Sequence, residues 1–305
     1  MHEFATWCVV DLTSSAAAVT HVMAGDASVS VVTYVIPGDA PVTGVTSLGD
    51  DVFVVRYDQS QQVEVYDAVT FTLQRSLSVP GLCSESHGLA ACASNKCLYA
   101  SDYCNALVHR VELTGSNAVT KWSVGRPMGL TVNSANNVVV VIQDERKLQE
   151  FTTHGTLLHT IHLQPDIKDP REVTELTSGQ FVISHRGMLH RVCLLDVKGA
   201  VVKSYGGTLL GSDLTKMSRL RGLAVDKHGN ILVADWDNNR LLVIDRSLTS
   251  AHEMSMPVDG GLNGPRSLWY DKSRGRLYVG EGRGRRVIII DYLKDFTASH
   301  VSPQS

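Results

Sequence analysis

Short apolar segments, each bounded by turn-forming residues, recur along most of this chain. The clearest example is residues 221–245, where apolar runs at 223–226, 231–234 and 240–245 alternate with two turns rich in Gly, Asn and Asp. Short apolar runs separated by such turns predict β-strands joined by hairpins. The same order of strand, turn and strand recurs in five further segments. The pattern therefore predicts an all-β chain built from repeats.

The period of the repeat predicts the architecture. The second strand of each unit starts at residues 52, 97, 138, 180, 231 and 276, at separations of 41 to 51 residues. Six units of about 45 residues, most of them with four strands, are typical of a six-bladed β-propeller. A single blade cannot cover both of its faces, so the six must pack in a ring.

The two ends of the repeat region predict how this ring closes. The last unit has three strands, and a Val-rich strand at 28–38 precedes the first unit. That N-terminal strand would complete the last blade and fasten the ring. On this prediction the propeller spans 28–296 and a tail spans 297–305. The remaining residues, 1–27, form an N-terminal extension that either adds an edge strand or is the remnant of a linker.

Residues 221–245 resemble the NHL repeat, in which apolar strands alternate with Asp-x-x-Gly-Asn and Ala-Asp-x-x-Asn-Asn-Arg turns. The positions that fit are Asp226, Gly229, Asn230, Ala234, Asp235, Asn238, Asn239 and Arg240. The whole chain resembles the C-terminal NHL domain of tripartite-motif (TRIM-NHL) proteins. The resemblance implies a six-bladed NHL propeller and suggests a scaffold in the ubiquitin pathway. The RING, B-box and coiled-coil segments of that family do not occur in this sequence, so no ligase activity is implied.

The polar residues of this repeat are expected to be structural. Asp235 and Arg240 flank one turn, where their pairing would fix the hairpin. Gly229 and Asn230 provide the backbone conformations of the preceding turn. We assign the same structural role to Asp226 and Asn239, which also belong to the repeat motif.

One end of the propeller is predicted to gather arginines and aromatic side chains. Antiparallel strands alternate in direction, so the start of each first strand lies at the same end of its blade as the turn after the second strand. In a propeller this end surrounds the mouth of the central channel. The candidate binding face there consists of His87, Arg171, Arg186, Arg221, Arg266, Arg283, Arg285, Trp236, Tyr57 and Tyr103. Arg56 occupies one of the same turns.

Charge narrows the class of ligand. Residues 1–170 carry 9 basic and 17 acidic side chains, whereas 171–305 carry 19 and 14, within a net charge of −3. This asymmetry predicts one electropositive sector on an acidic body. Arginine beside exposed aromatics suits an acidic or phosphorylated peptide, and it also suits stacked bases and phosphates. We therefore expect a non-catalytic platform that binds a protein or peptide partner. Single-stranded RNA, which the TRIM-NHL resemblance also implies, is the alternative ligand. A further alternative is that these charged residues form a solvated rim with no binding function.

An enzyme is a less favoured prediction. Six-bladed propellers include metal-dependent lactonase- and lyase-like enzymes, which need metal ligands converging on the channel. The residues that precede the first strands here are Thr43, His87, Met128, Arg171, Arg221 and Arg266. Three arginines would repel a cation. We therefore expect no catalysis, no metal, no cofactor and no small-molecule substrate.

The cysteines and the N-terminus bear on the cellular compartment. Cys92 and Cys97 flank a tight turn and could form a disulfide, but buried thiols suit a chain without a secretory signal. The sequence also lacks an Asn-x-Ser/Thr sequon and any run of about 18 apolar residues. We expect a cytoplasmic protein with no membrane partner.

Overall fold

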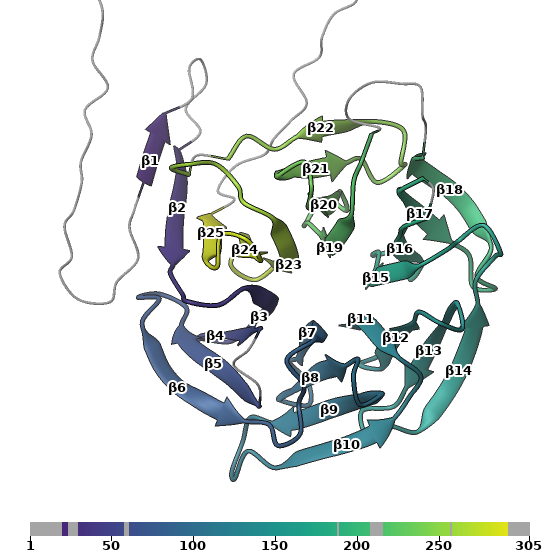
Figure 1. The fold of residues 1–305 in the computed structure, drawn as a ribbon, viewed down its shortest axis with the longest axis horizontal. Coiled ribbons are helices and arrows are strands. Elements are labelled where there is room, and N and C mark those ends of the chain that lie inside the picture. The colour runs from purple at the N-terminus through teal and green to yellow at the C-terminus, as the bar shows by residue number, and fades with distance from the viewer. Residues whose placement is uncertain are drawn as a thin grey trace, which may run out of the picture.

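Six antiparallel sheets surround a central axis in the computed structural model, which describes residues 20–23, 30–57, 61–187, 189–207, 216–256 and 258–291 (Figure 1). The predicted six-bladed β-propeller is confirmed. The described residues contain no helix that could cross a membrane.

Each of the first five blades is a four-stranded meander in chain order, running outward from the channel. Blade 1 consists of β3 (Val42–Leu48), β4 (Asp51–Arg56), β5 (Gln62–Asp67) and β6 (Leu73–Ser78). Blade 2 consists of β7 (Ser86–Cys92), β8 (Cys97–Asp102), β9 (Leu107–Glu112) and β10 (Val119–Ser123). Blade 3 consists of β11 (Pro127–Val132), β12 (Val138–Ile142), β13 (Lys147–Phe151) and β14 (Leu157–His162). Blades 4 and 5 consist of β15 (Pro170–Glu175), β16 (Phe181–His185), β17 (Arg191–Leu195) and β18 (Val201–Gly206); and β19 (Leu220–Val225), β20 (Ile231–Asp235), β21 (Arg240–Ile244) and β22 (Ala251–Glu253).

Blade 6 combines the two ends of the chain. It contains β23 (Pro265–Asp271), β24 (Arg276–Glu281) and β25 (Val287–Asp291), followed by β2 (Ser30–Ile36) and β1 (Thr20–Met23). β2 pairs with β25 from Val32 opposite Asp291 to Ile36 opposite Val287. The predicted closure by an N-terminal strand is confirmed, and β1 adds a further edge strand. Residues 1–19, 24–29 and 292–305 lie outside the described residues, and with them most of the predicted extension and the whole predicted tail.

The core is divided into six apolar layers, one between each pair of neighbouring blades. The layer between blades 6 and 1 packs Tyr278 and Ile289 against Val45 and Val54, all of them buried. Burying one such side chain contributes roughly 1.5–3 kcal/mol. The junction between the chain ends is therefore packed in the same way as the other five.

The motif residues of blade 5 make the contacts that their sequence positions predict. Asp226 accepts hydrogen bonds from the backbone N–H groups of His228 and Asn230, at 2.8 Å each, and Gly229 has a φ of 84°. Arg240 Nε donates to Asp235 Oδ2 at 2.8 Å. The Asn239 side chain accepts from the backbone N–H of Gly264 at 2.8 Å and so joins blade 5 to the entry of blade 6.

A register shift near the start of the inner strand occurs in every blade. The shifts lie between Pro170 and Glu172 in β15, between Leu220 and Leu223 in β19, and between Pro265 and Ser267 in β23. Such bulges bend a strand and change the direction of a side chain. Arg171, Arg221 and Arg266 lie within these three shifts.

Blades 4 and 6, which have Glu172 and Ser267, depart from the other four blades just after this bulge. Gly44, Gly88, Gly129 and Gly222 occupy this place in four blades, and a Cβ on any of them would approach the next blade to 2.8 Å or closer. Blade 4 has Glu172 here, and its carboxylate covers Gly129 of blade 3. The missing side chain on blade 3 thus makes room for an acid in the channel.

Candidate functional site

A cavity of about 380 Å³ opens at the end of the channel where the inner strands begin. We call it the arginine mouth, and its lining residues are Tyr57, Glu85, Tyr103, Gln143, Arg171, Arg186, Arg221 and Arg266. Six of these eight belong to the candidate face derived from the sequence. Gln143 and Glu85 were not predicted.

Two kinds of backbone position supply the four arginines. Arg171, Arg221 and Arg266 come from the bulged starts of β15, β19 and β23. Arg186 follows β16, and its backbone N–H donates to Asp169 O at 3.0 Å. The cations of three adjacent blades therefore converge because their strands enter the ring at the same end.

The arginines have few anionic partners. Asp169 accepts from Arg171 at 2.8 Å and lies 3.4 Å from Arg186, so one carboxylate serves two guanidinium groups. Gln143 also donates to Asp169. Within the described part of the chain, the buried Nε atoms of Arg171, Arg186 and Arg221 have no hydrogen-bond partner. Unsatisfied buried donors are rare in proteins and require an explanation.

Burial and mutual repulsion act on these guanidinium groups. Burial, followed by the charges of Arg266, Arg186 and Arg171, lowers the pKa of Arg221 to about 9. Burial and the neighbouring Arg171 lower the pKa of Arg186 to about 10. Burial also lowers the pKa of Arg266. All three remain cationic at neutral pH, but their charged forms are destabilised until an anion approaches.

Glu172 lies below the arginine mouth without neutralising it. Burial raises the pKa of its carboxyl to about 8, although the charges of Arg221, Arg266 and Arg171 oppose that rise. At pH 7 the carboxyl is therefore mainly protonated. Glu172 is not among the residues predicted for the binding face, and the signal for its position is the glycine that four other blades have there.

Cations partly cover the aromatic rings at and beside the mouth, and Trp236, which was predicted for the binding face, is not among the lining residues. The guanidinium carbons of Arg221 and Arg283 lie 5.4 and 5.2 Å from the ring centroid of Trp236. Trp236 also packs on the backbone at Gly282, where a Cβ would meet the indole at 2.1 Å. Arg126 lies 5.5 Å from the Tyr103 ring. Trp236 is thus built into the wall that holds Arg221.

The remaining predicted residues lie elsewhere. Arg283 pairs with Asp237 at 3.1 Å, and Arg285 donates to Asp39 O at 3.2 Å; both are exposed on the β24–β25 loop, outside the cavity lining. The side chain of His87 is outside the described residues.

Arg56 does not belong to an exposed face, contrary to the sequence-based expectation. Its side chain is 1% exposed and pairs with Glu64 at 2.8 Å. It also donates to the backbone carbonyls of Ala40, Arg285 and Pro37. Arg56 is the last residue of β4, the position that Asp235 has in β20. In blade 1 this position is basic and pairs with the acid Glu64, whereas in blade 5 it is acidic and pairs with Arg240.

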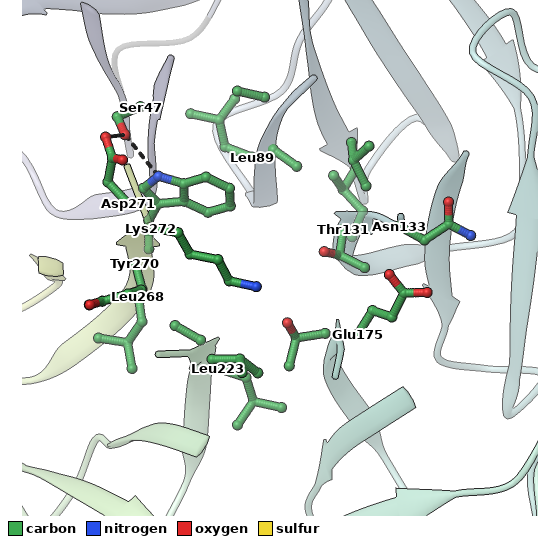
Figure 2. A pocket seen from close by; sticks show the side chains of 18 of the residues that line it. Ser47, Leu89, Thr131, Asn133, Glu175, Leu223, Leu268, Tyr270, Asp271 and Lys272 are labelled. Carbon is green, nitrogen blue, oxygen red and sulfur yellow. Dashed lines mark hydrogen bonds between the residues drawn. The ribbon is translucent and has the colours of Figure 1, made fainter. Parts of the chain in front are cut away.

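The channel continues from the arginine mouth to a second opening at the other end of the inner strands. This larger cavity, about 630 Å³, is lined by β3, β7, β11, β15, β19 and β23 and by the turns that follow them. Figure 2 shows Lys272 and Glu175 on opposite sides of it, with Ser47 and Asp271 on the same side as Lys272. Ser47 donates to Asp271 at 2.8 Å and accepts from the Trp269 indole at 2.9 Å. We call this opening the far mouth.

Comparisons with known proteins agree with the repeat and the fold. Residues 217–244 match the NHL repeat family. The protein "brain tumor" of Drosophila melanogaster is 22% identical over 144 residues, which cover 46% of this chain and 13% of the fly protein. The chain therefore matches only a small part of that relative's length.

Solved structures share the architecture at low sequence identity. Virginiamycin B lyase from Staphylococcus aureus is similar with a TM-score of 0.60 and 8% identity, over 86% of this chain and 99% of that one. Hydrazine synthase from Kuenenia stuttgartiensis gives 0.62 and 14%, over 85% and 98%. A protein of unknown function from Bacteroides thetaiotaomicron gives 0.67 and 11%, over 93% and 87%. At these identities the likeness concerns the fold alone.

Proposed function

We propose that this NHL-repeat propeller, which resembles the NHL domain of TRIM-NHL proteins, is a non-catalytic binding platform whose arginine mouth holds an anionic group of a protein partner. The observation that carries the proposal is the convergence of four arginines in one cavity, where among the described residues the Nε atoms of Arg171 and Arg221 have no hydrogen-bond partner and that of Arg186 has only a 3.4 Å ion pair. A phosphate or a pair of carboxylates would satisfy these donors and relieve the repulsion between the cations.

The shape and chemistry of the mouth favour a compact anion. A cavity of about 380 Å³ has room for one phosphorylated or acidic side chain. Guanidinium groups bind such oxygens through two parallel hydrogen bonds, which adds geometric selectivity to the charge attraction. Because Glu172 is mainly protonated at neutral pH, the positive charge of the mouth is available to the ligand.

Single-stranded RNA is the second candidate. Tyr57 and Tyr103 line the same cavity as the arginines, and aromatic rings beside cations are the usual platform for bases. The cations near Trp236 and Tyr103 reduce the aromatic area available for stacking. This observation ranks RNA below a protein partner.

A lyase- or lactonase-like activity receives less support. At 8% identity, the structural likeness to virginiamycin B lyase concerns the fold alone. Among the described residues, the one cluster of three potential metal ligands lies on the rim of blade 2 rather than in the channel.

The proposal can be tested by capture of partners from a cell extract on the intact chain. We expect proteins that are retained after ribonuclease treatment and lost after phosphatase treatment or in the Arg221→Ala/Arg266→Ala variant. The matched control is Arg75→Ala/Lys198→Ala, which removes two exposed cations outside the cavity lining.

Each outcome separates the candidates. Loss of all captured material on ribonuclease treatment would show that the ligand is RNA and not a protein. Equal capture by the parent and the Arg221→Ala/Arg266→Ala variant would remove the arginine mouth as the binding site for either ligand.

A further inference from the structure

A second cluster of reactive side chains lies on the rim of blade 2. The Sγ atoms of Cys83 and Cys104 and a carboxylate oxygen of Asp102 all lie within 4.8 Å of one another. No other group of three such ligand atoms occurs among the residues that the structure describes. We propose that Cys83, Asp102 and Cys104 form a binding site for a soft divalent cation of the zinc type, independent of the ligand of the arginine mouth.

The donor set and its spacing suit this ion. Zinc binds thiolate sulfur at about 2.3 Å and carboxylate oxygen at about 2.0–2.2 Å in tetrahedral geometry, which places ligand atoms roughly 3.5–3.8 Å apart. Small side-chain rotations would bring three atoms that lie within 4.8 Å of one another to that spacing. Thiolates select zinc-type ions over the harder magnesium and calcium.

Hydrogen bonds fix the orientation of the Asp102 carboxylate, as is usual for a metal ligand. It is fully buried, and its Oδ2 atom lies 3.0 Å from His109 Nε2 and 2.9 Å from Asn105 Nδ2. Its Oδ1 atom accepts from the Asn105 backbone N–H at 3.0 Å. The Cys83 backbone N–H is a fourth contact, 3.4 Å from Oδ2, and a carboxylate offers about four lone-pair sites. A bound cation would therefore replace one of these contacts, and the long one from Cys83 is the weakest. Contacts of this kind, including the histidine–carboxylate pair, orient ligands in metal sites.

Blade 5 shows what the same corner looks like without thiols. There Asp235 ends β20, Ser218 N donates to it at 2.7 Å, and Ser218 Oγ donates to Asp237 at 3.1 Å. The hydroxyl and the carboxylate satisfy each other, and the corner needs no ion.

Blade 2 replaces that self-sufficient pair by two cysteines. Asp102 is the last residue of β8, and the Cys83 backbone N–H donates to its Oδ2 at 3.4 Å. Cys104 lies two residues after Asp102, at the position that Asp237 has relative to Asp235 in blade 5. Thiols are weak hydrogen-bond donors and acceptors. A cation would supply the bonds that the serine–aspartate pair makes in blade 5.

The site is accessible and lies beside the arginine mouth. Cys104 is exposed, so an ion can enter and the fourth coordination position is open to water or to a group of a partner. Cys83 precedes Glu85 by two residues and Cys104 follows Tyr103, and both of these neighbours line the arginine mouth. A bound ion would therefore connect the loop before β7 to the loop after β8, and these two loops form the blade 2 side of the arginine mouth.

The test is a titration of the intact, reduced and metal-free chain with Cd²⁺ and Co²⁺, followed by sulfur-to-metal charge-transfer absorption. We expect one ion per chain with a thiolate signal. Cys104→Ser, a change at an exposed residue, should weaken binding by about 100-fold or more, and Cys83→Ser should do the same. The control is Cys193→Ala, which removes a buried thiol in blade 4 and should leave the signal unchanged.

Asp102→Asn tests the carboxylate, with the Cd²⁺ affinity as readout and circular dichroism as a check on folding. Binding that persists in Cys104→Ser, or the absence of a thiolate signal in the parent, would overturn the proposal. A Cys83–Cys104 disulfide found by mass spectrometry, with no metal bound by the reduced chain, would overturn it in favour of a redox pair. None of these outcomes depends on whether the arginine mouth binds a partner.

Discussion

The two mouths of the channel are formed by the same six inner strands, but their polar groups are arranged in opposite ways. At the far mouth, Asp271 accepts hydrogen bonds from the Ser47 hydroxyl at 2.8 Å and from the Ser273 N–H at 2.9 Å, and Glu175 accepts from the Ser134 N–H at 2.6 Å. At the arginine mouth, four cations share few anions, and within the described residues three buried Nε atoms make no hydrogen bond, that of Arg186 having only a 3.4 Å ion pair with Asp169.

The difference separates a stabilising arrangement from one kept for a ligand. Satisfied buried polar groups contribute to stability, whereas crowded like charges and unpaired donors cost free energy. Residues that oppose folding without an evident structural gain are expected at functional sites. The comparison therefore supports the proposal that the arginine mouth binds a ligand and that the polar groups of the far mouth are structural.

Charge reversal should have the largest effect on ligand affinity, and it should act at the arginine mouth but not at the far mouth. Arg221→Glu places an anion among Arg171, Arg186 and Arg266 and should weaken binding of a phosphorylated peptide by about 1,000-fold, because like charges in an interface cost several kcal/mol. Lys272→Glu at the far mouth is the matched control and should leave the affinity unchanged. Fluorescence anisotropy measures both. Similar losses in the two variants would indicate a long-range charge effect and no localised site.

Substitutions that test stability should act in opposite directions at the two mouths. Asp271→Ala leaves donors at Ser47 and Ser273 unpaired and should lower the free energy of unfolding by about 1–3 kcal/mol. Arg221→Met removes a crowded cation and should raise it by about 0.5–2 kcal/mol. Urea denaturation checks both values. Destabilisation by Arg221→Met would show that this arginine is structural.

Glu172 should make stability fall with rising pH. Its folded-state pKa of about 8 lies above the unfolded value of 4.5. The folded chain therefore holds a proton that the unfolded chain releases, and stability decreases between pH 4.5 and 8. Glu172→Gln should flatten this part of the profile and add on the order of 2 kcal/mol at pH 8. An unchanged pH profile of the unfolding midpoint in Glu172→Gln would exclude this assignment.

Salt dependence should show the smallest difference. With a single-stranded oligonucleotide as polyanionic probe, removing Arg266 should reduce the slope of log affinity against log salt by about 0.7, the value for one lost phosphate contact. Removing Lys272 should leave the slope as in the parent. Equal slopes for parent and Arg266→Ala would mean that Arg266 does not contact the phosphates.

The sequence was sufficient for the architecture because a propeller depends on quantities that are local in the chain. Strand length, turn residues and the spacing of the second strands determine six blades, and the three-stranded last unit calls for the strand that β2 provides. Strand direction alone placed Arg171, Arg221 and Arg266 at one end, and the structure brings them into one cavity.

The parts that the sequence did not reveal depend on side-chain contacts within and between blades. Arg56 is buried because Glu64 on the next strand compensates its charge. Glu172 fits only because Gly129 on the neighbouring blade has no side chain. Cys83 and Cys104 have no metal-binding spacing along the chain, and they meet because two loops of blade 2 lie side by side. Such pairings depend on where individual side chains lie in the folded blades and not on the repeat pattern.

The most direct test of the arginine mouth is to locate an anion on it. Crystals of the intact chain soaked in selenate, a tetrahedral oxyanion with a measurable anomalous signal, should show a peak between Arg171, Arg221 and Arg266, and the peak should vanish in Arg221→Ala/Arg266→Ala. Selenate bound at other surface arginines, with none at this mouth, would contradict the assignment of anion binding to this end of the channel.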